Sequence, residues 1–210
     1  MKRAFLLLLA LLAALGVVGS AWAPVGNPHG RVLAITFGPD LEINPVTQSY
    51  LTSKLSHAAD DGYRAAVILL DTPGGLSTSM KTIYTAELAS RIPVIVYVSP
   101  EGARAASAGV WVGQAADVLA MSPTSNIGSS TPIDSSGQNI SSDLRRKVIN
   151  DAAKSLKALA QTHHRNTTWP VLAVTKASNL TSSEALQMNV RDRILKALQE
   201  SALEIGRAHV

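Results

Sequence analysis

The chain contains no cysteine in its 210 residues. Disulfide bonds, thiolate catalysis and cysteine-ligated metals are therefore excluded. Histidine is also scarce, and none of the five histidines stands in an HExxH motif or a comparable spacing: His29, His57, His163, His164 and His209. Because metal sites need ligands at such spacings, we expect neither a metal ion nor another cofactor.

Aromatic residues make up only 4% of the chain, whereas hydrophobic residues make up 46%. The core must therefore consist mainly of alanine, valine, leucine and isoleucine. The net charge of +4 is small, and no run of lysine and arginine is interleaved with aromatics. Nucleic-acid binding thus has little support. The length fits one ordinary domain.

The first 23 residues have the layout of a secretory signal peptide. Lys2 and Arg3 precede an apolar run from Ala4 to about Val18, and a small-x-small sequence ends at Ala23. This run is shorter than the about 20 apolar residues that a membrane span needs, which favours cleavage, although retention as an anchor stays open. In both cases we expect an exported, extracytoplasmic domain over residues 24–203, periplasmic or on the outer face of the membrane.

The last seven residues, 204–210, have the sequence EIGRAHV. This tail matches the translation of a sequencing adapter. We therefore expect it to be non-native and the natural protein to continue beyond about Leu203.

Short apolar segments alternate with segments of helical periodicity along the chain. Strands are predicted over 31–39, 65–71, 93–99 and 117–122, and helices over 46–62, 77–91, 107–116 and 143–163. Continuous apolar runs of this length are typical of strands buried on both faces. The pattern predicts an α/β fold with a largely parallel sheet and flanking helices.

Two further segments carry clear local signals. Residues 134–142 contain one apolar anchor, Ile140, and predict a mobile surface loop. Thr181 and Glu184 have the spacing of a capping box and predict a last helix. The long helix 143–163 has an apolar face formed by Leu144, Val148, Ala152, Leu156 and Leu159.

Two segments could supply an acyl-transfer site. The first is the Pro-Gly-Gly turn with Gly74 and Gly75, whose backbone amides could hold a developing oxyanion, although for Pro-Gly-Gly alone an ordinary turn is the better explanation. The second is Ser107, and taken alone its stretch of alanine and glycine favours a packing serine. Successive strand ends meet at one edge of a parallel sheet, so Ser107 and the turn should lie together, with the Ala108 amide as a second oxyanion donor. The small neighbours of Ser107 would then let a substrate backbone approach its hydroxyl: Ala105, Ala106, Ala108 and Gly109.

A serine hydroxyl needs a base to become a nucleophile. No histidine occurs between His57 and His163. His57 is explained by the polar side of an early helix. His163 and His164 end the long helix next to Arg165, where the helix dipole favours a basic group. Lys147 borders the apolar face of the long helix and is the alternative base. Lys154 and Lys157, on the same helix, are expected to be solvated surface groups.

Four segments together resemble a known family: LDTPGG, PVIVYVSPEGARAASAG, AMSPTSNIGSSTPI and RKVINDAAKSLKALAQ. They are similar to the NfeD-type membrane-associated serine proteases, often described as stomatin-specific, within the ClpP/crotonase-like group. The resemblance covers about residues 30 to 190. One departure is NVRDRIL after SEALQM, where relatives usually carry a longer Val-Ile-Asp strand, and this leaves the C-terminal edge open.

The resemblance implies a ClpP/crotonase-like fold and a Ser-Lys dyad. The family motifs fall on Ser107 as nucleophile, Lys147 as base and Gly74 and Gly75 as the oxyanion turn. The implied function is an exported serine endopeptidase that cleaves apolar segments of membrane proteins, such as a stomatin-like partner, as a homodimer or larger assembly. A non-catalytic scaffold for that partner and a crotonase-like acyl-CoA enzyme are the alternatives, and an export signal speaks against a cytoplasmic thioester.

Overall fold

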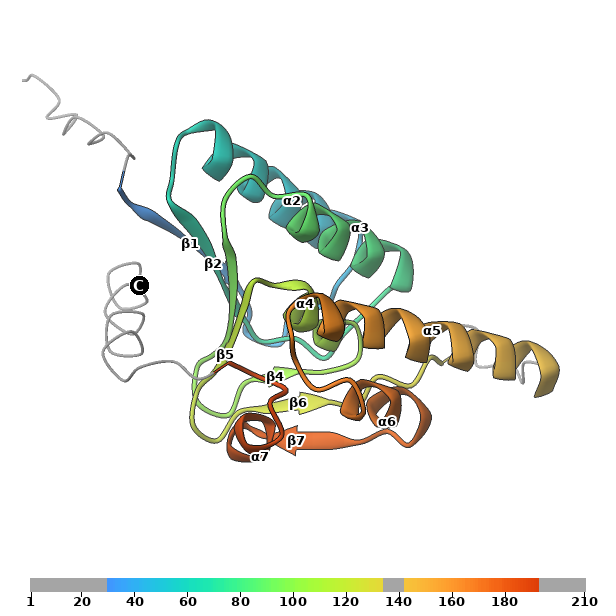
Figure 1. Ribbon diagram of the computed structural model, residues 1–210. Helices are drawn as coiled ribbons and strands as arrows, with labels where there is room; N and C mark the ends of the chain where they lie inside the picture. Colours follow the sequence, from blue (N-terminus) through green and yellow to red (C-terminus); the bar gives the residue numbers. More distant parts are fainter. Residues whose placement is uncertain (1–29, 134–141, 193–210) are drawn as a thin grey trace, which may run out of the picture.

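A four-stranded parallel sheet forms the centre of the molecule in the computed structural model, which describes residues 30–133 and 142–192 (Figure 1). Its order is β1-β2-β3-β5. The strands are β1 Val32–Phe37, β2 Ala65–Leu70, β3 Val94–Val98 and β5 Val118–Met121. The predicted α/β fold with a largely parallel sheet is confirmed.

Six helices occur in the described part of the chain. They are α2 Pro45–Asp60, α3 Ser77–Leu88, α4 Ala108–Ala115, α5 Ser142–Thr162, α6 Trp169–Thr175 and α7 Ser182–Gln187. The first three, α2, α3 and α4, lie on one side of this sheet (Figure 1). The predicted capping box at α7 is present: the Thr181 hydroxyl accepts from the Glu184 amide, and the Glu184 carboxylate accepts from the Thr181 amide. Such a cap pairs amides that a helix start otherwise leaves unpaired.

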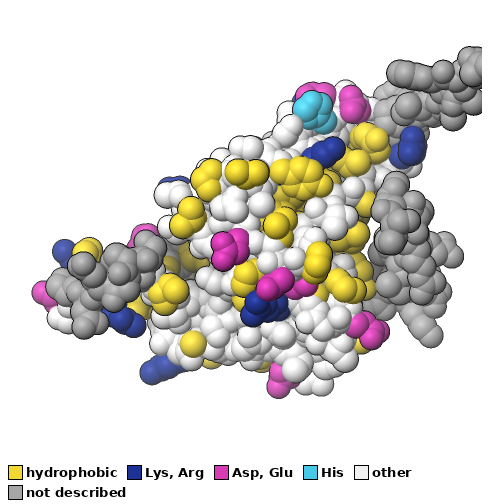
Figure 2. Space-filling model, turned by 180° about the vertical axis from the view of Figure 1, so that it is seen from behind, with side chains coloured by type: hydrophobic (Ala, Val, Ile, Leu, Met, Phe, Trp, Pro, Cys, Tyr) yellow, Lys and Arg dark blue, Asp and Glu magenta, His cyan; other side chains and the backbone are white. Residues whose placement is uncertain are grey.

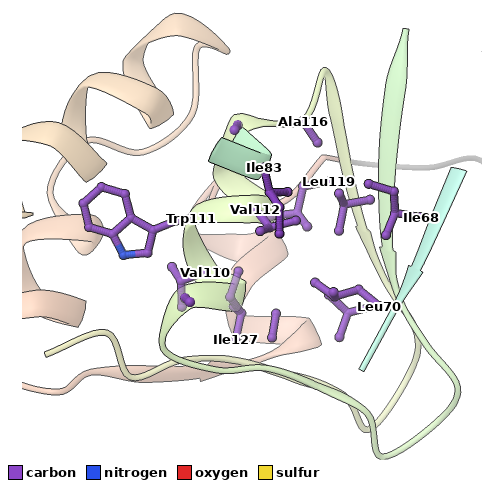
Figure 3. Packing of buried hydrophobic residues seen from close by; sticks show 14 of the residues in the cluster. Ile68, Leu70, Ile83, Val110, Trp111, Val112, Ala116, Leu119 and Ile127 are labelled. Carbon is purple, nitrogen blue, oxygen red and sulfur yellow. The ribbon is translucent and has the colours of Figure 1, made fainter. Parts of the chain in front are cut away.

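The core lies between the sheet and the helices α3 and α4. Ile35, Ile68, Val96 and Leu119 stand in one row across the four strands and are at most 1% exposed. Figure 3 shows Ile83 of α3 and Val112 of α4 close to Ile68 and Leu119. The sheet therefore fixes the position of α4, whose first turn follows Ser107.

A second, smaller sheet has the order β4-β6-β7 and was not predicted. Its strands are β4 Arg104–Ala105, β6 Asn126–Gly128 and β7 Asn179–Thr181. Strands of two or three residues are too short to show a period of two in the sequence. The helix α6 was missed as well. The small sheet nevertheless matters, because β4 leads directly into Ser107.

The long helix α5 corrects one expectation. Its predicted apolar face is buried only in the C-terminal half, at Leu156 and Leu159, while Leu144 is 53% exposed and Val148 is 38% exposed. Figure 1 shows the N-terminal half of α5 projecting beyond the rest of the molecule. The spacing of the apolar residues predicted the helix correctly. It does not show which part of the apolar face is covered by the rest of the protein.

Arg165 also differs from its expected role. The sequence suggests that the basic group after α5 serves the end of that helix. Instead the buried Arg165 guanidinium donates to the carbonyls of Gln114 and Ala116, at the end of α4, and to the Asp192 carboxylate. A cation at this place complements the negative end of α4 and satisfies carbonyls that the helix leaves unpaired.

Several expectations fall outside the described residues: the signal peptide 1–23, most of the loop 134–142 and the tail 204–210. Among the described residues, no helix is sufficiently long and apolar to span a membrane. In the same ranges, no group of histidine and acidic side chains is arranged to hold a metal ion.

Glu87 of α3 is buried, and neither of its carboxylate oxygens has a hydrogen-bond partner in the described part of the chain. Burial raises the pKa of this carboxyl well above its ordinary value, nearby Asp117 raises it further, and Arg165 opposes the shift. A raised pKa in the folded state means that stability is complete below the unfolded pKa of about 4.3 and is lost as pH rises toward the folded pKa.

Glu87→Gln should therefore leave the Tm near the parental value at about pH 4 and raise it by a few degrees at about pH 8. At this size, about 1 kcal/mol corresponds to a Tm change of about 2–4 °C. Thermal unfolding at both pH values measures this. Glu184→Gln is the opposite control, because hydrogen bonds from Thr181 lower the pKa of Glu184. The parent gains stability as Glu184 ionises and the variant does not, so the Tm of the variant should fall below that of the parent as pH rises. Equal Tm differences for Glu87→Gln at both pH values would contradict the prediction.

Candidate active site

The Gly-Gly turn lies between two other segments of the chain. On one side Thr72 forms a parallel bridge with Ala105, and on the other side Gly75 forms a parallel bridge with Ile43. The second bridge uses the Gly74 carbonyl, which accepts from the Ile43 amide at 2.7 Å, and the Leu76 amide, which donates to the Ile43 carbonyl at 2.8 Å. In a parallel ladder, the residue that stands between the bonded carbonyl and the bonded amide, here Gly75, points its own amide away from the partner strand. The Gly75 amide therefore faces away from Ile43.

Ser107 stands between the small sheet and α4, immediately before the first residue of that helix. Its φ of 50° and ψ of −115° lie in a region that non-glycine residues rarely occupy. Its side chain is half-buried, and its hydroxyl makes no hydrogen bond to the described residues. A serine hydroxyl that is held in a sharp bend at a helix start, without a partner, is available for chemistry.

Gly74 lies directly against Ser107. A Cβ added at Gly74 would come within 2.5 Å of the Ser107 Cβ and 3.0 Å of its Oγ. At the second residue of α4, a Cβ added at Gly109 would come within 2.6 Å of the Thr72 methyl group. The structure thus brings the predicted turn and the predicted serine together.

The small residues around Ser107 are expected from the sequence to let a substrate backbone come close. Ala105 and Ala108 are at most 3% exposed and Gly109 is buried, whereas Ala106 is half-buried. At Gly109 the small size also lets the chain's own turn pack against the start of α4, because an added Cβ would meet the Thr72 methyl group.

Two backbone amides near Ser107 remain unpaired. Within the described residues, neither the Gly75 amide nor the Ala108 amide has a hydrogen-bond acceptor. Gly75 is exposed, whereas Ala108 is the first residue of α4, where helix geometry leaves amides free and the helix dipole is positive. Two such donors beside one hydroxyl are the chemical requirement for stabilising an oxyanion.

Lys147 is not brought to Ser107. It lies in the projecting half of α5 with an exposed side chain, and no hydrogen bond joins it to Ser107 in this structure. Lys154 and Lys157, further along α5, are exposed as well. Lys147 borders Leu144 and Val148 on this helix, but both of these side chains are exposed, so the apolar face does not desolvate Lys147 in this conformation.

The segment 129–130 contacts Ser107 and was not identified from the sequence. The Ser107 amide donates to the Ser129 carbonyl at 2.7 Å, and the Ser130 hydroxyl donates to the Ser107 carbonyl at 3.0 Å. Serines in a Gly-Ser-Ser-Thr stretch carry no periodic signal. The small sheet that places β6 beside β4 is what brings them here.

Two large apolar side chains are exposed near the Gly-Gly turn. Leu76, directly after the turn, is 46% exposed, and Val46 at the start of α2 is 78% exposed. Figure 2 shows that hydrophobic side chains are scattered over the face it presents, with acidic and basic groups between them. Exposed apolar side chains beside a turn suit an apolar ligand.

Residues 38–209 match the family model described as NfeD1b, N-terminal domain. The chain belongs to the NfeD1b family. The membrane-bound protease PH1510 of Pyrococcus horikoshii is 36% identical over 160 residues, which cover 76% of this chain. The chain spans only 36% of that relative's length, so it corresponds to about a third of the curated relative.

Two solved structures of NfeD1b relatives are similar over most of the chain. Both are mutants of the 1510-N membrane-bound stomatin-specific protease. A serine-to-alanine mutant has a TM-score of 0.73 and 32% identity, with 82% of this chain and 83% of that chain covered. A lysine-to-alanine mutant, in complex with a substrate peptide, has a TM-score of 0.72 and 33% identity, with 78% and 74% covered. The predicted family is thereby confirmed.

A more distant structure confirms the predicted fold group. ClpP1 from Listeria monocytogenes has a TM-score of 0.60 at 18% identity, covering 79% of this chain and 91% of that chain. At this identity the likeness concerns the fold alone. The NfeD1b domain thus has a ClpP-like α/β fold.

Gly74→Ala should abolish the reactivity of Ser107. The added methyl group would overlap the Ser107 side chain, and the φ of +112° disfavours any side chain there. Gly102→Ala is the matched control, because Gly102 also has a positive φ (+80°) but no atom within 4 Å of an added Cβ. Peptide cleavage should fall at least about a hundredfold in the first variant and stay near parental in the second. Equal activity of both variants would show that the Gly74 contact has no part in the site.

Proposed function

We propose that this NfeD1b domain is a serine endopeptidase with Ser107 as its nucleophile. The observation that supports the proposal most is the contact of Gly74 with Ser107, whose neighbours in the chain, Gly75 and Ala108, have amides without an acceptor among the described residues. The solved relatives support it, since a serine and a lysine are the residues replaced in them and one of them binds a substrate peptide.

In the proposed reaction, the Ser107 Oγ attacks the carbonyl carbon of the scissile peptide while Lys147, in its neutral form, accepts the hydroxyl proton. The carbonyl oxygen of the substrate becomes an oxyanion that accepts hydrogen bonds from the Gly75 and Ala108 amides. The Gly74 carbonyl stays bonded to the Ile43 amide. The oxyanion then re-forms the carbonyl, the peptide C–N bond breaks, and Lys147 gives its proton to the leaving amine, so that the acyl group stays on Ser107 as an ester. Water hydrolyses the Ser107 ester by the same steps and returns both residues to their starting state.

The proposal requires a change at α5. Lys147 is exposed in this structure, whereas a general base must come within about 2.6–3.2 Å of the proton that it accepts. In enzymes without substrate, catalytic hydrogen bonds are often long and form only in the complex. We propose that the projecting half of α5 brings Lys147 to Ser107 when a substrate occupies the apolar surface beside Leu76.

The substrate class follows from the surroundings of the site. The exposed Leu76 and Val46 suit an apolar peptide segment, and the PH1510 relatives are described as membrane-bound and stomatin-specific. We propose apolar segments of a membrane-associated protein, for example a stomatin-like partner, as substrates. The proposal includes an exported catalytic domain over residues 24–203, a membrane-associated full-length protein and a homo-oligomer.

A non-catalytic scaffold is the second candidate. The exposed position of Lys147, without a hydrogen bond to Ser107, favours it. Such a scaffold would bind the same apolar partner at the surface beside Leu76 without hydrolysing it.

Substitutions of Lys147 and Ser107 separate the two candidates. Arginine keeps the positive charge and nearly the same length, but a guanidinium does not deprotonate in proteins. Lys147→Arg should therefore lose activity to the same degree as Lys147→Ala, and Ser107→Ala should lose at least about a thousandfold. Cleavage of an apolar peptide library by the full chain is the measurement.

Lys154→Arg and Lys157→Arg are the controls, since both lysines are exposed on the same helix. Both variants should cleave at the parental rate. Near-parental cleavage by Lys147→Arg would make Lys147 a surface charge, and peptide binding by the parent without any cleavage would favour the scaffold.

A further inference from the structure

The backbone of Ser107 is held in place from one neighbouring segment. Its φ of 50° and ψ of −115° are maintained only if the surroundings fix them. Both polar backbone groups of Ser107 bond to residues 129–130: the amide to the Ser129 carbonyl at 2.7 Å, and the carbonyl to the Ser130 hydroxyl at 3.0 Å. The carbonyl also accepts the first amide of the α4 ladder, from Val110 at 3.1 Å.

Ser130 is in turn oriented by Trp111. The indole Nε1 donates to the Ser130 Oγ at 2.8 Å, and both side chains are at most 6% exposed. An indole nitrogen can only donate, whereas a hydroxyl has one proton to give. Because the Ser130 oxygen accepts from Trp111, its own proton is directed to the Ser107 carbonyl.

The two hydrogen bonds that lead from Trp111 Nε1 through Ser130 Oγ to the Ser107 carbonyl are called the relay below. Trp111 and Ser130 are each held by a further element. Trp111 stacks on Tyr84 of α3 with a centroid distance of 6.0 Å, and Figure 3 shows its indole on the side of α4 away from Ile68 and Leu119. The Ser130 amide donates to the Ala173 carbonyl of α6 at 2.9 Å. Neither Trp111 nor Ser130 can therefore turn away without breaking other contacts.

We propose that Trp111 and Ser130 are positioning residues for the nucleophile, an inference that rests on the proposed function of Ser107. The chain of hydrogen bonds from Trp111 Nε1 through Ser130 Oγ to the Ser107 carbonyl holds the bend in which the Ser107 hydroxyl and the Ala108 amide face the same substrate carbonyl. Without it, Ser107 remains present but is misaligned. Misplacement of a reacting group by about 1 Å can cost about a hundredfold in rate.

The test is a set of purified variants assayed on one apolar peptide. Trp111→Phe removes the indole donor but keeps an aromatic ring beside Tyr84, and Ser130→Ala removes the hydroxyl. Each should lower kcat by about 10- to 100-fold with a change in KM below about threefold. Ser130→Thr keeps a hydroxyl and should recover most of kcat. The double variant Trp111→Phe with Ser130→Ala should be no slower than Ser130→Ala alone, because Trp111 acts through Ser130.

The chain offers a matched control in Trp169 and Ser178. The Trp169 Nε1 donates to the Ser178 Oγ at 3.1 Å, a bond of the same chemistry that does not end on Ser107. Trp169→Phe and Ser178→Ala should lower the Tm about as much as the test variants while keeping the parental kcat.

Parental kcat in both Ser130→Ala and Trp111→Phe would overturn the inference, as would an equal loss of kcat in the control pair. Should Trp111→Phe fail to fold, Ser130→Ala and Ser130→Thr decide the matter alone. Ser107→Ala is assayed beside them: if it stays active the proposed function fails, whereas if it is inactive and the relay variants are parental, only the relay is refuted.

Discussion

The close contact between Gly74 and Ser107 is the constraint on which the rest of the site depends. No side chain fits between them, because a Cβ at Gly74 would lie 2.5 Å from that of Ser107. A similar limit holds at Gly109, opposite the Thr72 methyl group. These two glycines let the turn after β2 pack against the start of α4, which follows β4 of the small sheet. The bridge between Thr72 and Ala105 joins the end of β2 to β4 and so places the turn beside Ser107.

The contact between Gly74 and Ser107 explains why the Gly75 amide comes near the Ser107 hydroxyl and the Ala108 amide. The bridge between Ile43 and Gly75 is formed by the Gly74 carbonyl and the Leu76 amide. The Gly75 amide therefore points away from Ile43. The Ala108 amide is free because α4 begins there. Both free amides are ordinary consequences of a ladder and a helix start, and in the proposed reaction they are the two oxyanion donors.

Much of the framework could be predicted from the sequence, since continuous apolar runs and helical spacing mark the four strands of the main sheet and the long helices. Ser107 and the Gly-Gly turn were identified as neighbours because strand ends meet at one edge. The small sheet, α6 and the serines 129–130 were not, because very short strands have no detectable period. The exposure of Leu144 and Val148 could not be predicted either, since a periodic face says nothing about the partner that covers it.

The central claim is that Ser107 forms a covalent acyl intermediate, and mass spectrometry after an acid quench tests it most directly. The full chain is mixed with an apolar peptide substrate, quenched within the first turnover and digested. The account predicts that the peptide containing Ser107 gains the mass of the acyl fragment, and that this adduct is absent when the protein is unfolded beforehand. Cleavage of the substrate without any adduct on Ser107, or with the adduct on another residue, would contradict it.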